Sequence, residues 1–566
     1  MNIDKALRTA HEYFQAGNFH QAEHVYKNIV EKKPNHIKAL YLLGITCLQI
    51  GEYHAAITYL NKVLHLDPRN AEVYYHLGVA FQDIGHHDEA IAHYRKALRI
   101  NPTYTIACYN LGVALQNTGH HDEAIQLYQK VLELNPSFAE AWNNLGTALK
   151  DKGRLDEAVI CYQKALELNP EISGVYNNLG VVSQYNGQLD EALAYYQQAL
   201  DLNPDLFDIY NNLGLLWRDK GELDKAATCF RKSLQINPGY ADAHWNMSYA
   251  FLLAGNFKEG WKEYEWRLKT HDFASVQRTF TQPVWDGSSL KGKTLLIFAE
   301  QGVGDEIMFA SCYPDVIDQA NVCIVECDKR LIPIFSRSFP RSDFVERVKE
   351  TDAYSSQLPQ TDMVIPHGSL PSFLRTDIAS FPRRKFYLIP DEEKVQSWHN
   401  RLKKLGEGLN AGISWRGGGT PRVIRKRSIM LEQGATLFSL SGVHFINLQY
   451  GDCVNELREA REKLGVTIHD WEDADPLKDI DNFAAQISAL DIVISVDNAT
   501  VHLAGALGKP VWTLLPFVPD WRWLLNREDS PWYPTMRLFR QHSPGDWESV
   551  IAKVSAELQK IIQKKA

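Results

Sequence analysis

The chain has 566 residues, 45% of them hydrophobic and 23% charged, with a formal net charge of −9 at pH 7. This length predicts roughly three or four domains of about 150 residues each, and the acidic balance argues against a general nucleic-acid-binding protein. The polar start of the chain, the lack of any apolar run of about 18 residues and the scattered cysteines predict a cytoplasmic protein without a membrane span.

A 34-residue period organises the first half of the chain. Glycine recurs at this step from Gly17 to Gly255, and a small position recurs from Gly44 to Gly214. Proline marks the same period at Pro34, Pro68, Pro102, Pro136, Pro170, Pro204 and Pro238. The pattern resembles the tetratricopeptide repeat, in which two amphipathic helices cross closely at small residues. Because one hairpin cannot bury its apolar face alone, we expect an α solenoid of seven repeats and a degenerate eighth over residues 1–271.

The eighth repeat departs from the pattern. Ser248 stands in place of the small glycine, Gly260 replaces an alanine, and "GNFKEGWKEYEWRL" is rich in aromatic residues. Terminal repeats differ from the consensus where one face meets another structure. We therefore expect this repeat to pack against the second half of the chain.

A column of asparagines follows the first helices of the later repeats. Each lies two residues before the small position: Asn110, Asn144, Asn178, Asn212 and Asn246. The column resembles the asparagine ladder in the repeat domain of O-GlcNAc transferases, and this implies a peptide groove, since an amide can bond both the C=O and the N–H of an extended polypeptide. The alternative is that asparagine only suits this helix position. His76 and Leu42 interrupt the column toward the N-terminus.

From about residue 283, apolar segments of strand length replace the repeat. They are "TLLIFAE", "NVCIVEC", "MVIPH", "AGISW", "HFINLQY", "DIVISV" and "PVWTLL", separated by helical stretches. This alternation predicts βα units and parallel sheets. The segments form two groups, so we expect two Rossmann-like lobes over residues 272–385 and 386–566, the α/β architecture called GT-B. A C-terminal helix with the apolar stripe of Trp547, Val554 and Leu558 would close both lobes.

The segment "SVDNATVHLAGALGKP" places a helix start directly after a strand. A helix N-terminus offers free N–H groups to a diphosphate. The candidate contacts are Asp497, Asn498, Ala499, Thr500 and His502. The alternative is that Asp497 or Asn498 caps the helix and that His502 packs against the sheet.

Four segments, in this order, resemble the heptosyltransferase-like GT-B glycosyltransferases, particularly bacterial proteins that fuse this domain to tetratricopeptide repeats. They are "GVGDEIMFA", "GISWRGG" with "RKRS" after it, "LQYGD" and "SVDNATVHLAGALGKP". The resemblance spans residues 290–540 and implies acceptor binding in the first lobe and nucleotide-sugar binding in the second. The histidine-threonine-threonine-glycine run of O-GlcNAc transferases is missing, so the similarity to those enzymes is one of architecture.

The turn "GVGDE" carries the expected catalytic base. By the resemblance, Asp305 faces the cleft and accepts the proton of the acceptor hydroxyl. Glu306 is the rival, and the alternative for both is that a carboxylate merely suits the first turn of a helix. Gly302 and Gly304 would let the acceptor approach the backbone closely.

Positive charge for the leaving diphosphate is expected from "SWRGGGTPRVIRKRS", since no D-x-D motif stands at a strand end to hold a metal. Arginine matches phosphate oxygens. Arg416 and Arg427 are the preferred pair, with Arg425 beside them, and a solvated basic loop is the alternative. Gln449 is a further candidate contact to the base or ribose.

Together these features predict an inverting, metal-independent glycosyltransferase that needs no cofactor. It would move a sugar from a nucleotide sugar, a UDP-sugar before others, to a Ser/Thr hydroxyl of a protein in the repeat groove, with flagellin as one candidate acceptor. Two alternatives stay open: a scaffold with a vestigial nucleotide-sugar-binding domain, and a glycosyltransferase that acts on a saccharide. We expect no nucleic-acid or membrane partner, and the sequence leaves the oligomeric state open.

Overall fold

The computed structural model describes residues 2–270, 273, 278, 280–347 and 361–565. The chain divides into two compact units, Met1–Asp205 and Leu206–Ala566. This division lies inside the repeat array, whereas the predicted boundary at residues 271 and 272 lies outside the described residues. Within the described ranges, no helix has both the length and the apolar character that a membrane crossing requires.

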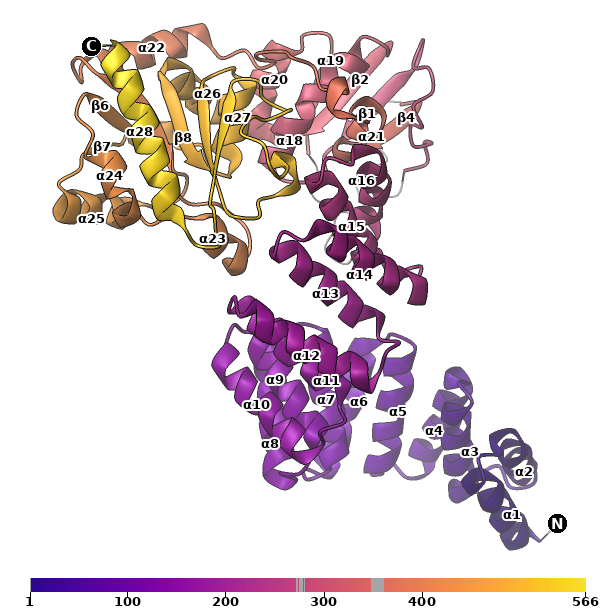
Figure 1. The fold of residues 1–566 in the computed structure, drawn as a ribbon. Helices are drawn as coiled ribbons and strands as arrows, with labels where there is room; N and C mark the ends of the chain where they lie inside the picture. Colours follow the sequence, from indigo (N-terminus) through magenta and orange to yellow (C-terminus); the bar gives the residue numbers. More distant parts are fainter. Residues whose placement is uncertain (1, 271–272, 274–277, 279, 348–360, 566) are drawn as a thin grey trace. The chain divides into compact units, whose positions relative to one another are not determined.

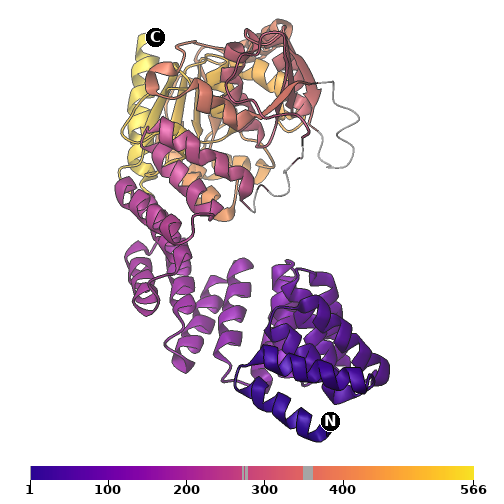
Figure 2. The ribbon, with the colours of Figure 1, turned by 90° about the vertical axis from the view of Figure 1, so that its right-hand side faces the viewer.

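The first unit is a series of helical hairpins, coloured indigo to purple in Figures 1 and 2. Its helices are α1 (Ile3–Gln15), α2 (Phe19–Lys32), α3 (Ile37–Gln49), α4 (Tyr53–Leu66), α5 (Ala71–Asp83), α6 (His87–Ile100), α7 (Thr105–Asn117), α8 (His121–Leu134), α9 (Ala139–Asp151), α10 (Leu155–Leu168), α11 (Ser173–Tyr185) and α12 (Leu189–Leu202). Two helices correspond to each 34-residue period, as predicted.

The recurrent small residues have a direct steric reason. A Cβ on Gly78 would lie 2.4 Å from the ring of Tyr94 on the paired helix, so no larger residue fits without moving that ring. The turn glycine Gly85 has a φ of 79°, a left-handed conformation that suits glycine. The helical array of tetratricopeptide repeats in the N-terminal half is therefore confirmed.

The second unit begins with the last two repeats. They comprise α13 (Phe207–Asp219), α14 (Leu223–Ile236), α15 (Ala241–Leu253) and α16 (Phe257–Tyr264). Phe257, Trp261 and Tyr264 of α16 belong to the same buried core as the strands that follow, and Trp261 Nε1 donates to the Arg375 carbonyl at 2.7 Å. The aromatic face of the eighth repeat is thus covered by the α/β part of the chain, as its sequence predicts.

The first α/β region holds a four-stranded parallel sheet in the order β3-β2-β1-β4. Its elements are β1 (Thr294–Phe298), α18 (Val303–Phe309), α19 (Tyr313–Ile317), β2 (Val322–Cys327), α20 (Ile332–Ser338), β3 (Asp343–Glu346), β4 (Met363–Pro366) and α21 (Leu370–Leu374). Leu296 of the central strand pairs with Ile324 on one side and Val364 on the other. The apolar runs of β1 and β4 are buried, which is why they do not alternate with polar residues.

The second α/β region holds a six-stranded parallel sheet in the order β10-β9-β8-β5-β6-β7. Its elements are α22 (Glu392–Lys403), β5 (Leu409–Ser414), α23 (Pro421–Arg427), α24 (Ala435–Phe438), β6 (Val443–Asn447), α25 (Val454–Leu464), β7 (Ile468–His469), α26 (Ile480–Ala489), β8 (Ile492–Val496), α27 (Ala499–Ala506), β9 (Val511–Leu515), β10 (Met536–Arg540) and α28 (Trp547–Lys565). The chain leaves β5 in one direction through β6 and β7, and returns to its other side with β8.

The C-terminal helix α28 buries the predicted stripe, including Trp547, Val554 and Leu558. These residues share a core with β5, β8 and β9, and α28 packs on α24 and β10 (Figure 1). The helix therefore covers the six-stranded sheet, in place of the predicted packing across both lobes.

Candidate functional site

Helix α18 of the first α/β region and helix α27 of the second contact each other. A Cβ on Gly304 of α18 would lie 3.3 Å from His502 Cδ2 and 3.5 Å from Ala499 Cα on α27. The space in front of Gly304 is thus filled by α27, whereas the sequence suggested an approaching acceptor there. Gly302 caps α18 with an ordinary φ of −83°.

Asp305 lies in the first turn of α18 and faces the second α/β region. One carboxylate oxygen, Oδ2, accepts from the Gly302 N–H at 3.3 Å, and the other is paired with the Arg522 guanidinium. The Asp305 side chain retains 23% exposure. Burial raises the pKa of Asp305, and the charge of Arg522 opposes this rise.

Glu306, the rival carboxylate, points into the first α/β region. It is only 2% exposed, and its Oε2 accepts from the Asp328 N–H at 2.8 Å. Arg347 lies 3.8 Å from its other oxygen. Burial raises the pKa of Glu306 to about 8. Two adjacent residues of one helix thus have separate surroundings. Asp305 pairs with Arg522 of the second α/β region, and Glu306 is buried within the first.

Arg522 lies in the β9–β10 connector, residues 516–535, which contains the short 3-10 helix η9 (Trp521–Trp523). Its Nη1 is 2.5 Å from Asp520 Oδ1, in addition to its pair with Asp305. The connector is also fixed to the last repeat, because the Leu525 N–H donates to the Leu253 carbonyl at 3.0 Å.

The connector has a constrained backbone directly after Arg522. Leu524 and Asn526 have φ values of 51° and 58°, and they are the non-glycine residues with positive φ within the described part of the chain. A branched residue such as leucine adopts this conformation only when its surroundings hold it there. The Leu524 carbonyl accepts from Arg540 Nη2 at 2.7 Å, which is one such restraint.

The start of α27 is an internally satisfied cap. Asn498 Oδ1 accepts from the Thr500 N–H at 3.0 Å, and Asn498 Nδ2 donates to Ser414 Oγ at 2.7 Å and to the Arg416 carbonyl at 3.0 Å. Thr500 Oγ1 lies 3.4 Å from the Leu448 carbonyl. Asn498 therefore links the ends of β5 and β8. Its contacts are those of a helix cap, which is the alternative role that the sequence left open.

Asp497 and His502 flank this cap in buried positions. Burial raises the pKa of Asp497 to about 6, and Asp520 adds to this rise while Arg427 and Arg522 oppose it. Burial lowers the pKa of His502 well below its usual value, and both arginines lower it further. His502 is consequently neutral near pH 7, with Nδ1 2.9 Å from the Tyr533 hydroxyl.

The basic loop after β5 presents its arginines in different ways. Arg427 is 3.8 Å from Asp497, and its guanidinium donates to the Gly418 carbonyl. Arg416 Nη2 donates to the Asp452 carbonyl at 2.8 Å, while Arg425 is exposed on α23. Gln449 is occupied by this loop, since its Oε1 accepts from the Arg416 N–H at 2.8 Å.

Among the described residues, two arginines whose charges act on Asp497 each carry a donor without a hydrogen-bond partner. These donors are the buried Nε atoms of Arg427 and Arg522. Buried donors normally have a hydrogen-bond partner, so two arginines that each lack one call for an explanation. A bound anion would supply the acceptors that both groups lack.

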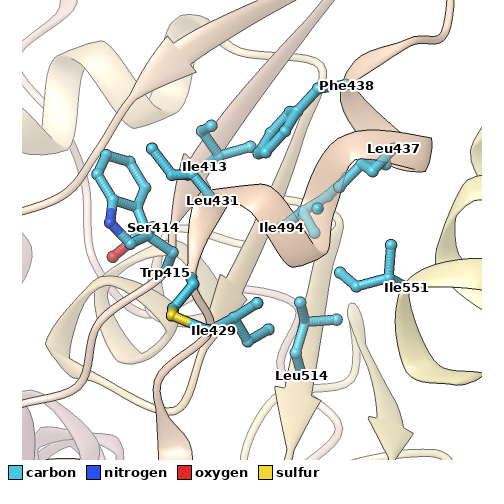
Figure 3. A pocket seen from close by; sticks show the side chains of 12 residues that line it. Ile413, Ser414, Trp415, Ile429, Leu431, Leu437, Phe438, Ile494, Leu514 and Ile551 are labelled. Carbon is cyan, nitrogen blue, oxygen red and sulfur yellow. The ribbon is translucent and has the colours of Figure 1, made fainter. Parts of the chain in front are cut away.

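The basic loop rests on an apolar layer. Side chains of β5, β8, β9, η7 (Leu431–Gly434), α24 and α28 converge with Trp415 and Ile429, which lie at the two ends of the loop (Figure 3). Leu431, Leu437 and Phe438 are among them. The gap between them measures about 30 Å³, close to the size of one water molecule. This layer supports the loop and has no room for a ligand.

A larger pocket of about 250 Å³ opens at the carboxyl ends of β6 and β7. Its lining includes Gln449, Asp452, Asp470, Trp471 and Lys478. The pocket combines an aromatic ring with carboxylates and lies next to the basic loop, because the Asp452 carbonyl accepts from Arg416.

The ladder asparagines bond from one repeat to the preceding one. In the first unit, Asn110, Asn144 and Asn178 donate to Tyr75 Oη at 3.3 Å, Tyr109 Oη at 2.9 Å and Asn143 Oδ1 at 2.9 Å. In the second unit, Asn246 donates to Asn211 Oδ1 at 3.0 Å, and Asn212 also has an interaction partner. All five side chains are half-buried. Each ladder position thus strengthens the stack and still faces solvent in part.

The described residues include one group with metal-ligand spacing, formed by Glu23, Cys47 and Glu52 in the first unit. Lys27 already pairs with Glu23, and burial raises the pKa of the Cys47 thiol to about 11. Both features oppose metal binding, which needs free carboxylates and a thiolate.

The sequence missed Arg522 and Asp520, which are central to the site. They lie in "PDWRW", after the last predicted strand, and no phosphate-binding motif marks them. The tryptophan-rich composition of this loop was the available signal, since buried aromatics in a connector indicate that it packs into a core.

Comparisons with known proteins identify the repeats. Residues 13–78 match the tetratricopeptide repeat, and residues 69–265 match the C-terminal domain of cilia and flagella-associated protein 70. Protein FlbA of Caulobacter vibrioides is 33% identical over 319 residues, which are 54% of this chain and 53% of FlbA. The chain thus matches about half the length of this curated relative.

Solved structures match parts of the chain. A crystal structure of MamA is 36% identical, covering 28% of this chain and 94% of MamA with a TM-score of 0.28. A tetratricopeptide repeat protein from Parabacteroides merdae is 18% identical, covering 44% of this chain and 98% of its own, with a TM-score of 0.39.

Proposed function

We propose that the α/β part of the chain is a GT-B glycosyltransferase of the inverting, metal-independent kind. The observation that carries this proposal is the ion pair between Asp305 on α18 and Arg522, which, like Arg427, has a buried donor without a hydrogen-bond partner. A base and an anion site side by side are what sugar transfer from a nucleoside diphosphate requires.

The strand order supports nucleotide binding in the second α/β region. Numbered within its own sheet, the order β7-β6-β5-β8-β9-β10 is the 3-2-1-4-5-6 order of doubly wound folds, which bind ligands where the order reverses. Here the reversal lies between β5 and β8, and Arg416, Asp497 and Asn498 follow these two strands. The diphosphate would lie at this point, against Arg427 and Arg522.

The pocket at β6 and β7 suits the nucleoside. Its carboxylates, Asp452 and Asp470, can accept hydrogen bonds from ribose hydroxyls, and Trp471 offers a ring for base stacking. The nucleoside class stays a proposal, with uridine preferred.

In the proposed step, the acceptor hydroxyl oxygen forms a bond to the anomeric carbon while the bond from that carbon to the diphosphate oxygen breaks. The hydroxyl proton passes to Asp305, and the electron pair of the broken bond leaves with the diphosphate. Arg427 and Arg522 stabilise this added negative charge. One displacement inverts the anomeric centre, and the products are the glycosylated acceptor, a nucleoside diphosphate and a proton.

A protein acceptor is supported by the last repeats. Asn246 and Tyr249 are three residues apart on α15, so they lie on neighbouring positions of one helix face. The ring centroids of Tyr249 and Trp521 lie 6.5 Å apart, and α15 contacts η9, so this face of α15 adjoins the site. A peptide held by the α15 amide would therefore be close to Asp305.

One observation favours the saccharide alternative. The ladder amides already bond within the repeat array, as Asn144 does with Tyr109, and a purely structural role would explain the column. The two functions differ in whether a ladder variant loses acceptor binding.

The direct test is a donor-hydrolysis screen. The full chain is incubated with UDP-, GDP-, ADP-, CMP- and dTDP-sugars, and released nucleotide is measured against Asp305→Asn as a matched control. We expect slow nucleotide release from one donor class, and we expect the rate of this release to differ in Asp305→Asn. If every donor stays intact and none binds, the scaffold alternative replaces this proposal.

A further inference from the structure

Arg522 is the residue that connects the proposed base with the proposed anion site. Its guanidinium pairs with Asp305 through Nη2 and with Asp520 through Nη1. Its Nε is buried without a hydrogen-bond partner. Arg522 therefore has two carboxylate partners and one donor that nothing satisfies.

The same site involves Arg427, which lies 3.8 Å from Asp497. Both arginines act on the pKa of Asp497 and on that of His502, and Arg427 carries a second unsatisfied buried Nε. Two cations that act on the same carboxylate, each with an unpaired buried donor, are complementary to a ligand with several negative oxygens. A diphosphate has that chemistry.

The pair with Arg522 conflicts with the role of Asp305 as a base. A cation bonded to a carboxylate favours the ionised form and lowers its tendency to take a proton. The remaining oxygen is bonded to the Gly302 N–H at 3.3 Å. In this arrangement each oxygen of Asp305 has a partner, and an acceptor hydroxyl would have to compete with one of them.

We propose that Arg522 is a donor-dependent switch: the diphosphate of the donor takes the Arg522 guanidinium away from Asp305, and Asp305 becomes available to the acceptor hydroxyl only when the donor is bound. This inference rests on the proposed function, whose donor supplies the diphosphate. Arg522 keeps an anionic partner in both states, because its guanidinium exchanges Asp305 for the diphosphate. Its pair with Asp520 holds it in place throughout the exchange.

The switch gives the reaction an order. Without donor, Asp305 is the second carboxylate, beside Asp520, that offsets the cost of burying the Arg522 guanidinium. With donor, the phosphate oxygens take over this task. The acceptor is then deprotonated only in the ternary complex, and the connector that carries Arg522 is held in place by the contact of Leu525 with Leu253.

The test measures binding, so it does not depend on turnover. UDP, GDP, ADP, CDP and dTDP, with inorganic pyrophosphate as the probe without a nucleoside, are titrated into the full chain by calorimetry. The variants are Asp305→Asn, Arg522→Gln, Arg522→Lys and the double variant Asp305→Asn/Arg522→Gln. Asp318→Asn is the matched control, because Asp318 is a 71% exposed carboxylate of the same region that pairs with Arg341.

Asp305→Asn removes the competitor for Arg522. We therefore expect the nucleoside diphosphate that the wild type binds to bind this variant about tenfold more tightly, a gain of ~1.4 kcal/mol in binding free energy. Arg522→Gln should weaken binding by about tenfold or more, and Asp305→Asn should give no gain in that background. Asp318→Asn should leave the affinity unchanged.

Three results would overturn the switch. The first is a nucleoside diphosphate that binds equally to the wild type and to Asp305→Asn. The second is a gain in Asp305→Asn that Asp318→Asn reproduces, which would reflect net charge. The third is a gain that persists in the double variant. If no probe binds to any variant, the proposed function fails together with the switch. If a probe binds and one of the three results appears, only the switch fails. Should Arg522→Gln not fold, Arg522→Lys and the Asp305→Asn comparison with Asp318→Asn still decide the question.

Discussion

Gly304 on α18 and His502 on α27 are in contact across the two α/β regions, so closely that a Cβ on Gly304 would lie 3.3 Å from His502 Cδ2. The Ala499 backbone stands 3.5 Å from the same point. The contact sets how near Asp305, one residue further along α18, comes to the connector that carries Arg522.

Gly304→Val should force the two helices apart. Overpacking of this kind costs about 1–3 kcal/mol, and we expect a lower Tm by calorimetry together with weaker donor binding. Gly302→Ala is the control, since Gly302 has an ordinary φ of −83° and a Cβ there would meet Asp305 Oδ2 at 3.6 Å. Equal Tm values for Gly304→Val and Gly302→Ala would show that the helix contact does not need glycine.

Asp305→Asn should abolish most sugar transfer. The amide keeps the size of the side chain but cannot take the proton, so we expect the transfer rate to fall by about 10²–10⁴ while the donor still binds. Glu306→Gln should retain most activity, because Glu306 is buried against the Asp328 N–H and away from Arg522. The measurement is single-turnover transfer with saturating donor. A large loss in Glu306→Gln alone would move the base to Glu306.

Glu306 should make stability depend on pH. Its pKa is about 8 in the folded protein and 4.5 as the ordinary value. Between these values the folded state binds more protons than the unfolded state, so the free energy of unfolding falls as pH rises from about 5 to about 8, by at most ~1.4 kcal/mol per pH unit. Glu306→Gln should lack this component in urea-unfolding midpoints measured across that range. Parallel curves for the two proteins would contradict it.

The ladder should bind acceptor independently of its role in the repeat stack. Asn144→Ala, alone and combined with Asn178→Ala and Asn212→Ala, should weaken protein modification while donor hydrolysis continues, at about 1 kcal/mol for each lost hydrogen bond. Tyr109→Phe is the matched control, since it removes the partner of Asn144 and keeps the amide. If Tyr109→Phe and Asn144→Ala reduce modification equally, the ladder acts through the stack and the saccharide acceptor is favoured.

Transfer should survive a chelator. With Arg427 and Arg522 holding the diphosphate in the proposed mechanism, excess EDTA should leave the initial rate within about twofold, because no metal ion takes part in charge stabilisation. Loss of most activity in EDTA, with recovery in magnesium or manganese, would contradict the arginine assignment.

The helical array of tetratricopeptide repeats and the α/β character of the second half could both be predicted from the residues alone. Both rest on short-range rules: the 34-residue period repeats one hairpin, and apolar runs such as "DIVISV" are buried on both faces of a parallel sheet. The predicted segments became β1, β2, β4, β5, β6, β8 and β9. The strands that were missed, β3, β7 and β10, lie at sheet edges, where less burial leaves a weaker pattern.

The composition of the candidate site, by contrast, could not be predicted from the sequence. The sequence supplied Asp305 and Arg427 but treated Glu306 as equivalent to Asp305, and a single helical step of about 100° separates a carboxylate that meets Arg522 from one buried against Asp328. Arg522 lies 217 residues from Asp305 along the chain, and their contact depends on how two sheets, a connector and the last repeat pack together. Local sequence fixes which elements form, whereas the partners of a buried charge are fixed by long-range packing.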